Sequence, residues 1–491
     1  MYEERYPNPN LWFRLPNNTY TRPGVSQLVK NVQAAVVSFS TRMTLSDPGQ
    51  CTWTATFVAT PNGVSAADVL RGTLPSFAAA RSAQTWWYNN IKAMDLVGIS
   101  LGKSPVYFIG CVTNKQRSRS VVGGKVVNSI TISGVALGGI FSRQNILALY
   151  NLGNEFRDAP GAWGILANSV FGERLTFLTE TTGQQLRASL IMLFRKFLAI
   201  DIRFDQTPLS GSVPALIRDK LEDYLDLDSG VSQELAQYYT NRNTTVFPAN
   251  SSVSLWQKAR EFIPNPWFEA WFDVGLNPDV GDKVVLYARK PPFGYTRWNE
   301  LPNASGNIVE TVTLEEVVEE SVGVDCSDVM SIFYPKFTGT LLSKDSMAIL
   351  FPPLVSERLM QRFGIRAYQP EVTFVTYPSD EDNAGQIWGM MKGLRGALAE
   401  WYSLADEMES GTLTVKGRTD LRIGYKMRLR YSDSESKDFY IEGVDQSWSL
   451  RSPWVTKLSV TRGLSQERLF ATIHELNLME SQLPGGMEQI A

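Results

Sequence analysis

Histidine and cysteine are scarce in this 491-residue chain, which contains one His and three Cys. A zinc-protease helix needs a second histidine four residues after the first, and Leu478 occupies that position after His474. Cys51, Cys111 and Cys326 are widely spaced and odd in number, so we expect no disulfide framework and interpret each as a small buried apolar residue. The sequence therefore predicts no metal site, no cofactor and no catalytic residue, with a structural role for His474.

Long apolar runs and a strong net charge are also missing. No uninterrupted apolar stretch reaches the roughly 20 residues that a membrane-spanning helix needs. The N-terminus lacks the basic and apolar regions of a signal peptide, so we expect a soluble protein made in the cytoplasm. A net charge of −3 gives no overall attraction to nucleic acid or to an anionic membrane. Residues 123–125 (GGK) and 134–139 (GVALGG) do not complete a phosphate-binding or dinucleotide-binding motif.

Aromatic residues, in contrast, are plentiful: the chain has 13 Trp, 18 Tyr and 24 Phe. Such side chains dominate large protein interfaces and the cores of β-barrels. The length predicts roughly two to four domains of ordinary globular composition.

Alternating apolar residues predict β-strands near both ends of the chain. Near the C-terminus, every second residue of 421–431 is apolar and Arg or Lys residues lie between them, which predicts one strand with a core face and a charged face. Near the N-terminus, Trp53, Ala55 and Phe57 alternate with threonines. A hairpin in Phe108–Gly134 is similar to a second one in Tyr440–Gly463, which suggests an internal repeat.

Helical spacing predominates in the middle of the chain and before the last β segment. Residues 141–263 have apolar residues three and four apart and predict a mainly helical domain, and a heptad pattern predicts a helix in 379–408 laid on the adjacent barrel. A further helix is expected to end at Gly364 as its C-cap. The predicted organisation is an N-terminal extended arm (1–27), a first β domain (28–140), a helical insertion (141–263), the first part of a second β domain (264–335), a small mixed α/β domain (336–378), the heptad helix with the rest of the second β domain (379–465), and a C-terminal helix and tail (466–491).

Two charged segments stand out. Lys115, Arg117 and Arg119 are predicted to lie in the loop of the first hairpin, where they are either solvated or paired with an acidic partner surface. The acidic residues within 315–320 are predicted to form a solvated loop or a strand edge.

The order of several motifs resembles one protein family. EWYSLADEMESGTLTVKGRTDLRIGYKMRLR (400–430) resembles that family's helix followed by a Gly-led strand, and the hairpin ending at Thr461-Arg462-Gly463 is similar to its next element. Segments 265–275, 286–302 and 357–370 resemble further elements in the same order, as does the first hairpin region. The family is the central baseplate hub proteins of contractile bacteriophage tails, related to the hub part of type VI secretion spikes and to phage late-control proteins.

This resemblance implies an α+β fold with two tail-tube-like antiparallel β-barrel domains, a mainly helical insertion domain and a smaller mixed domain. It implies a homotrimer, without enzymatic activity, that adapts a sixfold tail tube to a threefold central spike in the virion baseplate. The implied partners are the tail tube or its terminating protein, the spike, the tape-measure protein and baseplate wedge proteins, with DNA passing through the lumen during genome ejection. No fused lysozyme domain is expected after Gly463.

A different class of function is left open by the residues alone. Many tryptophans suit stacking on sugars, and two of the 50 acidic residues would suffice for glycoside hydrolysis. The alternative is therefore a carbohydrate-binding or glycan-hydrolysing β-protein, such as a receptor-binding tail component. No motif selects a particular pair of carboxylates.

Overall fold

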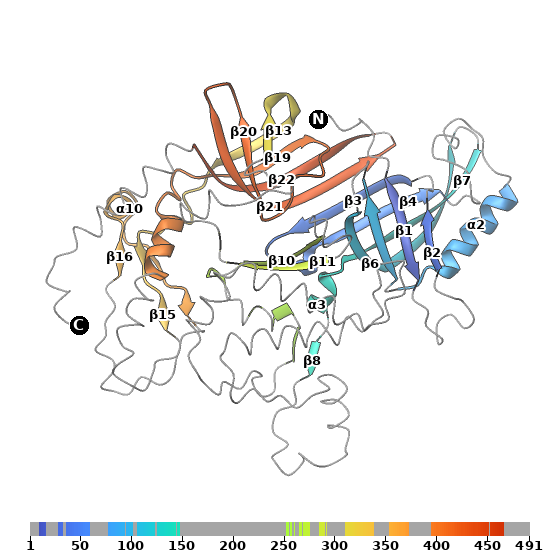
Figure 1. The fold of residues 1–491 in the computed structure, drawn as a ribbon, viewed down its shortest axis with the longest axis horizontal. Helices are drawn as coiled ribbons and strands as arrows, with labels where there is room; N and C mark the ends of the chain where they lie inside the picture. Colours follow the sequence, from blue (N-terminus) through green and yellow to red (C-terminus); the bar gives the residue numbers. More distant parts are fainter. Residues whose placement is uncertain are drawn as a thin grey trace, which may run out of the picture.

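The computed structural model of this chain is built around one long β-sheet (Figure 1). The structure describes residues 9–15, 28–32, 36–58, 77–93, 95–101, 106–122, 125–143, 145–147, 252–254, 256–257, 260, 265–267, 269–274, 284–289, 291, 310–337, 353–372, 394–450 and 452–465. The statements below concern these residues.

The main sheet has 13 strands in the order β13-β19-β22-β21-β3-β4-β7-β6-β5-β1-β2, with β20 beside β21 and β12 beside β20. Its pairs are antiparallel except β12–β20, which is parallel. The strands are β1 (Asn10–Leu15), β2 (Leu28–Val32), β3 (Val36–Thr44), β4 (Thr52–Val58), β5 (Leu96–Ser100), β6 (Val106–Val122), β7 (Lys125–Ala136), β12 (Glu310–Thr313), β13 (Val317–Val324), β19 (Glu409–Lys416), β20 (Lys426–Arg430), β21 (Ser436–Ser449) and β22 (Ser452–Leu464).

The N-terminal and C-terminal β segments are joined edge to edge in this sheet. In Figure 1 the C-terminal strands (orange and red) continue directly into the N-terminal strands (blue and teal). One hydrophobic cluster contains residues of both segments, from Leu11 to Val460. The predicted fold class is therefore wrong: the described strands form one large, mostly antiparallel sheet, and not two separate closed barrels flanking a mainly helical domain.

The predicted alternation of β4 is confirmed. Trp53, Ala55 and Phe57 are buried, while the threonines between them face outward or are half-buried. The Trp53 indole Nε1 donates to the carbonyl of Cys111 at 3.3 Å. A Cβ on Gly134 would lie 1.8 Å from that same carbonyl oxygen, so glycine permits the close approach of β7 to β6 around the indole.

The alternation of 421–431 is only partly realised. β20 begins at Lys426, because Gly424 has a φ of 77° and interrupts the extended backbone before it. Leu421 and Ile423 are buried as expected, but so are the charged residues Arg422 and Lys426. The pattern predicted the apolar side chains correctly and missed that charged ones would be buried with them.

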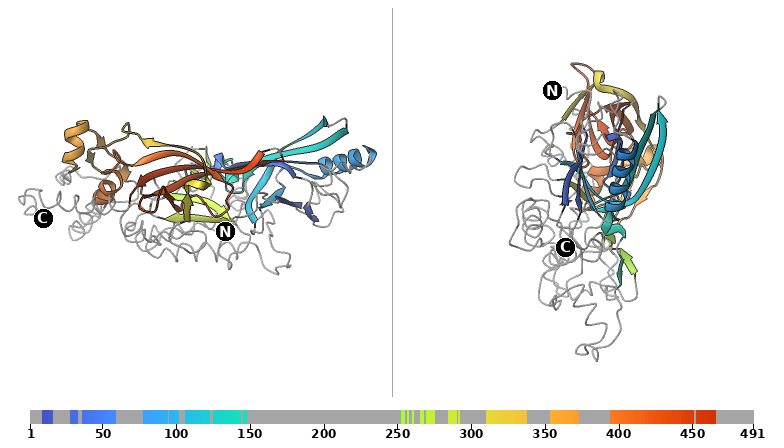
Figure 2. Two further views of the ribbon diagram at one scale, coloured as in Figure 1. Left: turned by 90° about the horizontal axis from the view of Figure 1, so that it is seen from above. Right: turned by 90° about the vertical axis from the view of Figure 1, so that its right-hand side faces the viewer.

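Helices are few and short among the described residues. α2 (Phe77–Asn90) lies beside the β6–β7 hairpin at one end of the molecule, and α3 (Gly139–Arg143) follows β7 (Figure 2). α10 (Glu357–Phe363) has Ser356 as its N-cap and ends at Gly364, as predicted. Of the predicted heptad helix, residues 394–402 are helical with Leu394, Leu398 and Trp401 buried, and 379–393 lie outside the described residues.

Short sheets complete the fold: β8 (Asn145–Leu147) with β9 (Ser252–Ser254), β10 (Glu269–Val274) with β11 (Val284–Arg289), β14 (Ile332–Phe333) with β16 (Leu354–Val355) and β17 (Ala367–Tyr368), and β15 (Lys336–Phe337) with β18 (Glu371–Val372). Of the last two sheets, β15, β16, β17 and β18 fall within residues 336–378, and β14 precedes that range. β8 and β9 lie near the two ends of segment 141–263 and pair with each other. The predicted helices between them, in residues 148–251, lie outside the described residues. The predicted C-terminal helix with His474 also lies outside the described residues. Part of the predicted N-terminal arm forms β1, whose Phe13 is buried in the core.

Gly396 offers a test of the helix at 394–402. A Cβ at this position would meet nothing within 4 Å, so Gly396→Ala is expected to raise the free energy of unfolding by about 0.5–1 kcal/mol, because alanine restricts the unfolded chain more than glycine does. Denaturant unfolding measures the change. Gly364→Ala is the matched control: its φ of 77° disfavours a Cβ, and stability should fall by about 1 kcal/mol.

The cysteines offer a second test. Burial raises the pKa of Cys51 to about 11 and that of Cys111 to about 12, so at pH 8 both thiols stay protonated and shielded. Cys326 is only half-buried, which corrects the expectation that all three are buried. A thiol reagent at pH 8 should label at most one cysteine, Cys326, in the folded protein and all three in denaturant. Fast labelling of a second thiol without denaturant would contradict the packing around Cys51 and Cys111.

Candidate assembly interface

Five strands of the N-terminal segment and five of the C-terminal segment have the same connectivity. Strands β3 to β7 lie in the order β3-β4-β7-β6-β5 and define the first module; β13 and β19 to β22 lie in the order β13-β19-β22-β21-β20 and define the second module. Every corresponding pair is antiparallel. The internal repeat predicted from the two hairpins is therefore confirmed at the level of strand order.

The two modules also share two β-bulges, although a further register shift, at Trp448 in β21, has no counterpart in β6. A β-bulge lies at Val37 in the first module and at Val318 in the second, and another at Thr113 and at Glu442. Because bulges fix strand register, these positions align the modules residue by residue. The aligned hairpins differ by three residues from the sequence match: the structure places Cys111, and not Phe108, at the position of Tyr440. The pairing of β6 with β5 ends at Cys111, and the pairing of β21 with β20 ends at the aligned residue, Tyr440.

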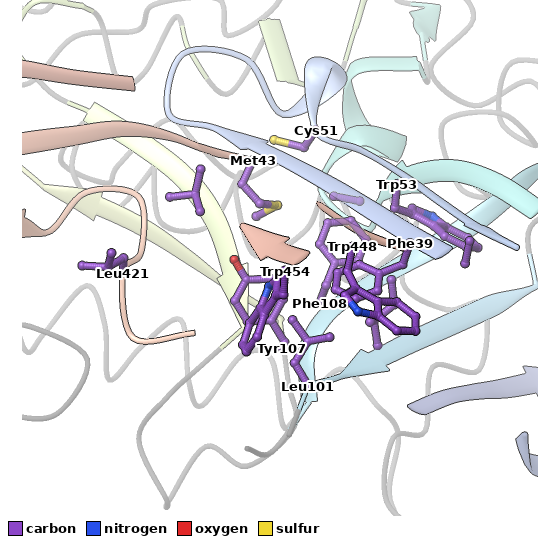
Figure 3. Packing of buried hydrophobic residues seen from close by; sticks show 14 of the residues in the cluster. Phe39, Met43, Cys51, Trp53, Leu101, Tyr107, Phe108, Leu421, Trp448 and Trp454 are labelled. Atoms are coloured by element: carbon purple, nitrogen blue, oxygen red, sulfur yellow. The ribbon is translucent and has the colours of Figure 1, made fainter. Parts of the chain in front are cut away.

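The modules are joined by β21 and β3. The second half of β21 pairs with β3, with Ser447 opposite Ser40 and Trp448 opposite Phe39. The rings of Phe39 and Trp448 are stacked with centroids 6.1 Å apart, and both are buried (Figure 3). Such a cross-strand aromatic pair stabilises the junction by about 0.5–1.5 kcal/mol beyond the area it buries. An aromatic, dry contact therefore holds the two modules in one sheet.

The strands that correspond to β21 and β3 in the other module are β6 and β13, and both carry charged side chains. The basic residues Lys115, Arg117 and Arg119 lie on β6 itself, which corrects their predicted position in a loop. Arg117 and Arg119 are exposed. The acidic segment 315–320 runs through the 3-10 turn η3 (Leu314–Glu316) into β13, an exposed edge strand, as one of its two predicted alternatives stated. The outer half of β6 is thus basic, and β13, at one end of the strand order, is acidic.

Helix α2 holds the basic hairpin from one face. The Lys115 ammonium donates to the carbonyls of Tyr88 and Ile91 at 2.5 and 2.6 Å, and the Arg117 guanidinium lies 4.4 Å from the centre of the Tyr88 ring. The Gln84 side-chain amide donates to the Ser118 carbonyl at 3.0 Å. These contacts hold the hairpin of β6 and β7, which lies beside α2 at one end of the molecule in Figure 2. Its basic residues lie on β6.

A buried ion pair ties the modules to β10. Arg422 lies in the second module, and its Nη1 donates to Asp273 Oδ1 at 3.0 Å and to the Tyr107 carbonyl at 2.9 Å in the first module. Its guanidinium also lies 4.1 Å from the centre of the Tyr107 ring. Burial raises the pKa of Asp273, while the neighbouring positive charge of Arg422 opposes the rise. The pair therefore cross-links three distant segments inside the core.

A second ionic cluster attaches α10 to the turn that follows the helix at 394–402. Asp406 is buried, and its carboxylate accepts from both Arg358 Nη atoms at 2.7 and 2.8 Å and from Arg362 at 3.1 Å. These contacts join the small mixed part to the residues that lead into β19. An aspartate occupied in this way acts in packing and is not available as a catalytic carboxylate.

The described residues show few features of a metal site, a membrane span or a sugar-binding surface. They contain no group of three His, Cys, Asp or Glu placed to hold a metal ion. None of the described helices is long and apolar enough to cross a membrane. Tryptophans that could stack on sugars lie mostly in the core: Trp86 is the large aromatic residue exposed within the described part of the chain, at 37%. No feature of the described residues favours the carbohydrate alternative.

Comparison with known proteins gives structural likeness at low similarity. No protein-family model and no curated protein sequence matches the chain. A tail protein from Neisseria meningitidis MC58 aligns with a TM-score of 0.41 and 11% identity over 92% of this chain and 96% of its own. The 43 kDa tail protein of prophage MuSo2 from Shewanella oneidensis aligns with a TM-score of 0.41 and 10% identity over 94% and 97%. An E. coli type VI secretion component, described as structurally similar to two T4 bacteriophage tail proteins, has a TM-score of 0.35 and 10% identity over 88% and 74%. With TM-scores below 0.5, these likenesses do not assign a function.

Proposed function

We propose that this chain is a non-enzymatic structural protein of a phage tail, a baseplate hub that assembles as a homotrimer. The observation that carries the proposal is the module repeat: two units with one connectivity and one register share a single sheet. Three such chains would present six equivalent β modules around one axis. That arrangement suits a protein that meets a sixfold tube on one side and a threefold spike on the other.

The sequence resemblance to baseplate hubs supports the same assignment. The role proposed here needs two modules held at a fixed angle, and the shared sheet, the stacked Phe39 and Trp448 and the buried Arg422–Asp273 pair provide that rigidity. Two closed barrels are not part of the proposal, since a repeated sheet module serves the same symmetry. The proposed partners are a tail-tube protein, a central spike and a tape-measure protein, and DNA would pass along the axis during genome ejection.

Mass in solution tests the proposal. Sedimentation velocity of the purified full chain should show a species of three times the 54.9 kDa chain mass, without affinity for glycans on an array. A monomer at every concentration that binds a glycan would favour the carbohydrate alternative and contradict the hub. Substituting Glu400, an exposed acidic residue, should leave the assembly unchanged, because no interface or catalytic role is assigned to it.

A further inference from the structure

The repeat supplies a template for the contact between chains. Within one chain, the second half of β21 pairs with β3. The counterpart of β21 in the repeat is β6, and the counterpart of β3 is β13. Among the described strands, β6 beyond Val112 pairs with β7 alone, and β13 pairs with β19 alone. We propose that β6 of one copy pairs antiparallel with β13 of the next copy, in the register that β21 and β3 use within the chain. This inference rests on the proposed trimer and names its contact.

The bulges determine which residues would face each other. Ser447 lies five residues after the Glu442 bulge, and Ser118 lies five residues after the equivalent Thr113 bulge. Ser40 lies three residues after the bulge at Val37, and Ser321 lies three residues after the equivalent bulge at Val318. Since Ser447 pairs with Ser40, Ser118 should lie opposite Ser321 of the next copy.

The neighbouring positions follow from the same alignment. Within the chain, Trp448 of β21 lies opposite Phe39 of β3. The aligned residues in the proposed contact are Arg119 of one copy and Glu320 of the next. Glu320 is exposed, and its Oε1 accepts a hydrogen bond from the Tyr431 hydroxyl at 2.7 Å. Opposite charges facing each other across paired strands are favourable.

The charges of the two edges also select which edges can pair. Two β6 strands would bring Arg117 and Arg119 close to basic residues, and two β13 strands would bring Glu319 and Glu320 close to acidic ones. Like charges opposite each other destabilise paired strands, so both self-pairings are disfavoured. The contact is therefore head to tail, and a contact of this kind either closes a ring or grows as a filament. Closure at three copies is the form that the proposed function requires.

Both edges are accessible in the single chain. On β6, Arg117, Ser118 and Arg119 are exposed, and on β13 all residues from Val318 to Ser321 are exposed. Val318 and Val324 are exposed apolar side chains, at 60% and 45% of their surface, on a strand that pairs on one side alone among the described strands. Exposed charge keeps such edges soluble, and complementary charge gives them one preferred partner.

Engineered cysteines test the register directly. Ser118→Cys and Ser321→Cys are made separately in a Cys326→Ser background, mixed, and treated with copper phenanthroline or a short bismaleimide. We expect a cross-linked dimer containing one chain of each variant, and no cross-linked product from either variant alone. The chain with both substitutions should give a covalent product of three chains. Ser40→Cys with Ser447→Cys is the positive control, because it should cross-link at the same register within one chain.

The failures can be told apart. If the protein sediments as a trimer and the Ser40–Ser447 control cross-links, but Ser118 and Ser321 do not, this contact is wrong and the proposed hub stands. If Ser118→Cys cross-links to itself, a twofold contact replaces the head-to-tail one and overturns the proposal. If the chain is a monomer at every concentration, both the contact and the hub fail.

A charge exchange gives an independent test. Arg119→Glu alone and Glu320→Arg alone should each weaken assembly by about tenfold or more, because each places like charges opposite each other. The two substitutions in one chain should restore assembly to near the original strength. Arg81→Glu is the matched control: it makes the same change of charge at an exposed position of α2, away from the proposed edge, and should leave assembly within about twofold. Failure of the double variant to recover would contradict the Arg119–Glu320 pairing.

Discussion

Replacing Asp273 with asparagine is expected to lower the free energy of unfolding by about 3–5 kcal/mol. The substitution leaves Arg422 charged inside the core, where its side chain is 4% exposed and contacts the carbonyl and ring of Tyr107. A buried charge without its counter-charge carries the full cost of leaving water. Thermal or denaturant unfolding followed by tryptophan fluorescence measures the change, with Trp271 two residues away on the same strand.

The matched variant removes both charges. Asp273→Leu combined with Arg422→Met should cost far less than Asp273→Asn alone, because well-packed apolar residues replace a buried pair at little net cost. The difference between the single and double variants isolates the coupling of the two residues. A double variant as unstable as Asp273→Asn would show that the pair is not the reason these segments stay together.

The second large effect is expected at Gly134. A Cβ here would lie 1.8 Å from the Cys111 carbonyl oxygen and 2.8 Å from the Trp53 indole nitrogen, so β6 and β7 would have to separate. Gly134→Ala should therefore lower the free energy of unfolding by about 3 kcal/mol, at the upper end of the range for overpacked cores. The loss of the Trp53–Cys111 hydrogen bond should shift the tryptophan emission to longer wavelength.

Gly323 is the control for this prediction. It also lies in a strand, but a Cβ there meets nothing within 4 Å, so Gly323→Ala should change stability by no more than about 0.5 kcal/mol. Equal effects at both glycines would mean that strand glycines act through chain entropy alone and that the close approach around Trp53 is unimportant.

Local patterns predicted much of the fold correctly. The alternation in β4, the runs that form β6 and β7, the helix ending at Gly364 and the exposed acidic edge all follow from neighbouring residues. The repeat was visible in the sequence, but with an error of three residues. The sequence of a short strand does not determine its register. The bulges at Thr113 and Glu442 give the correct alignment, and they can be identified only once the pairing of the strands is known.

Long-range pairing could not be predicted. Nothing near Phe39 or Trp448 in the sequence indicates that they stack on each other, since they are brought together by β3 and β21 from opposite ends of the chain. Arg422 looked like part of a solvated face because its acidic partner, Asp273, is distant in sequence. For the same reason the two β segments were predicted as separate barrels when they share one sheet.

The two junctions of the repeat differ in a way that suits their roles. Inside the chain, aromatic residues at the junction are buried permanently as the protein folds. Between chains, the aligned positions carry Arg119 and Glu320, which are exposed charged residues in the single chain. An aromatic pair at an exposed edge would promote unspecific strand pairing before assembly.

Electron microscopy of the purified full-length protein tests the central claim most directly. Views along the axis should show a closed ring with threefold symmetry in which six similar β modules alternate, each chain contributing two. Twofold particles, open filaments, or rings in which the two modules of a chain are not related by a rotation about the ring axis would contradict the account.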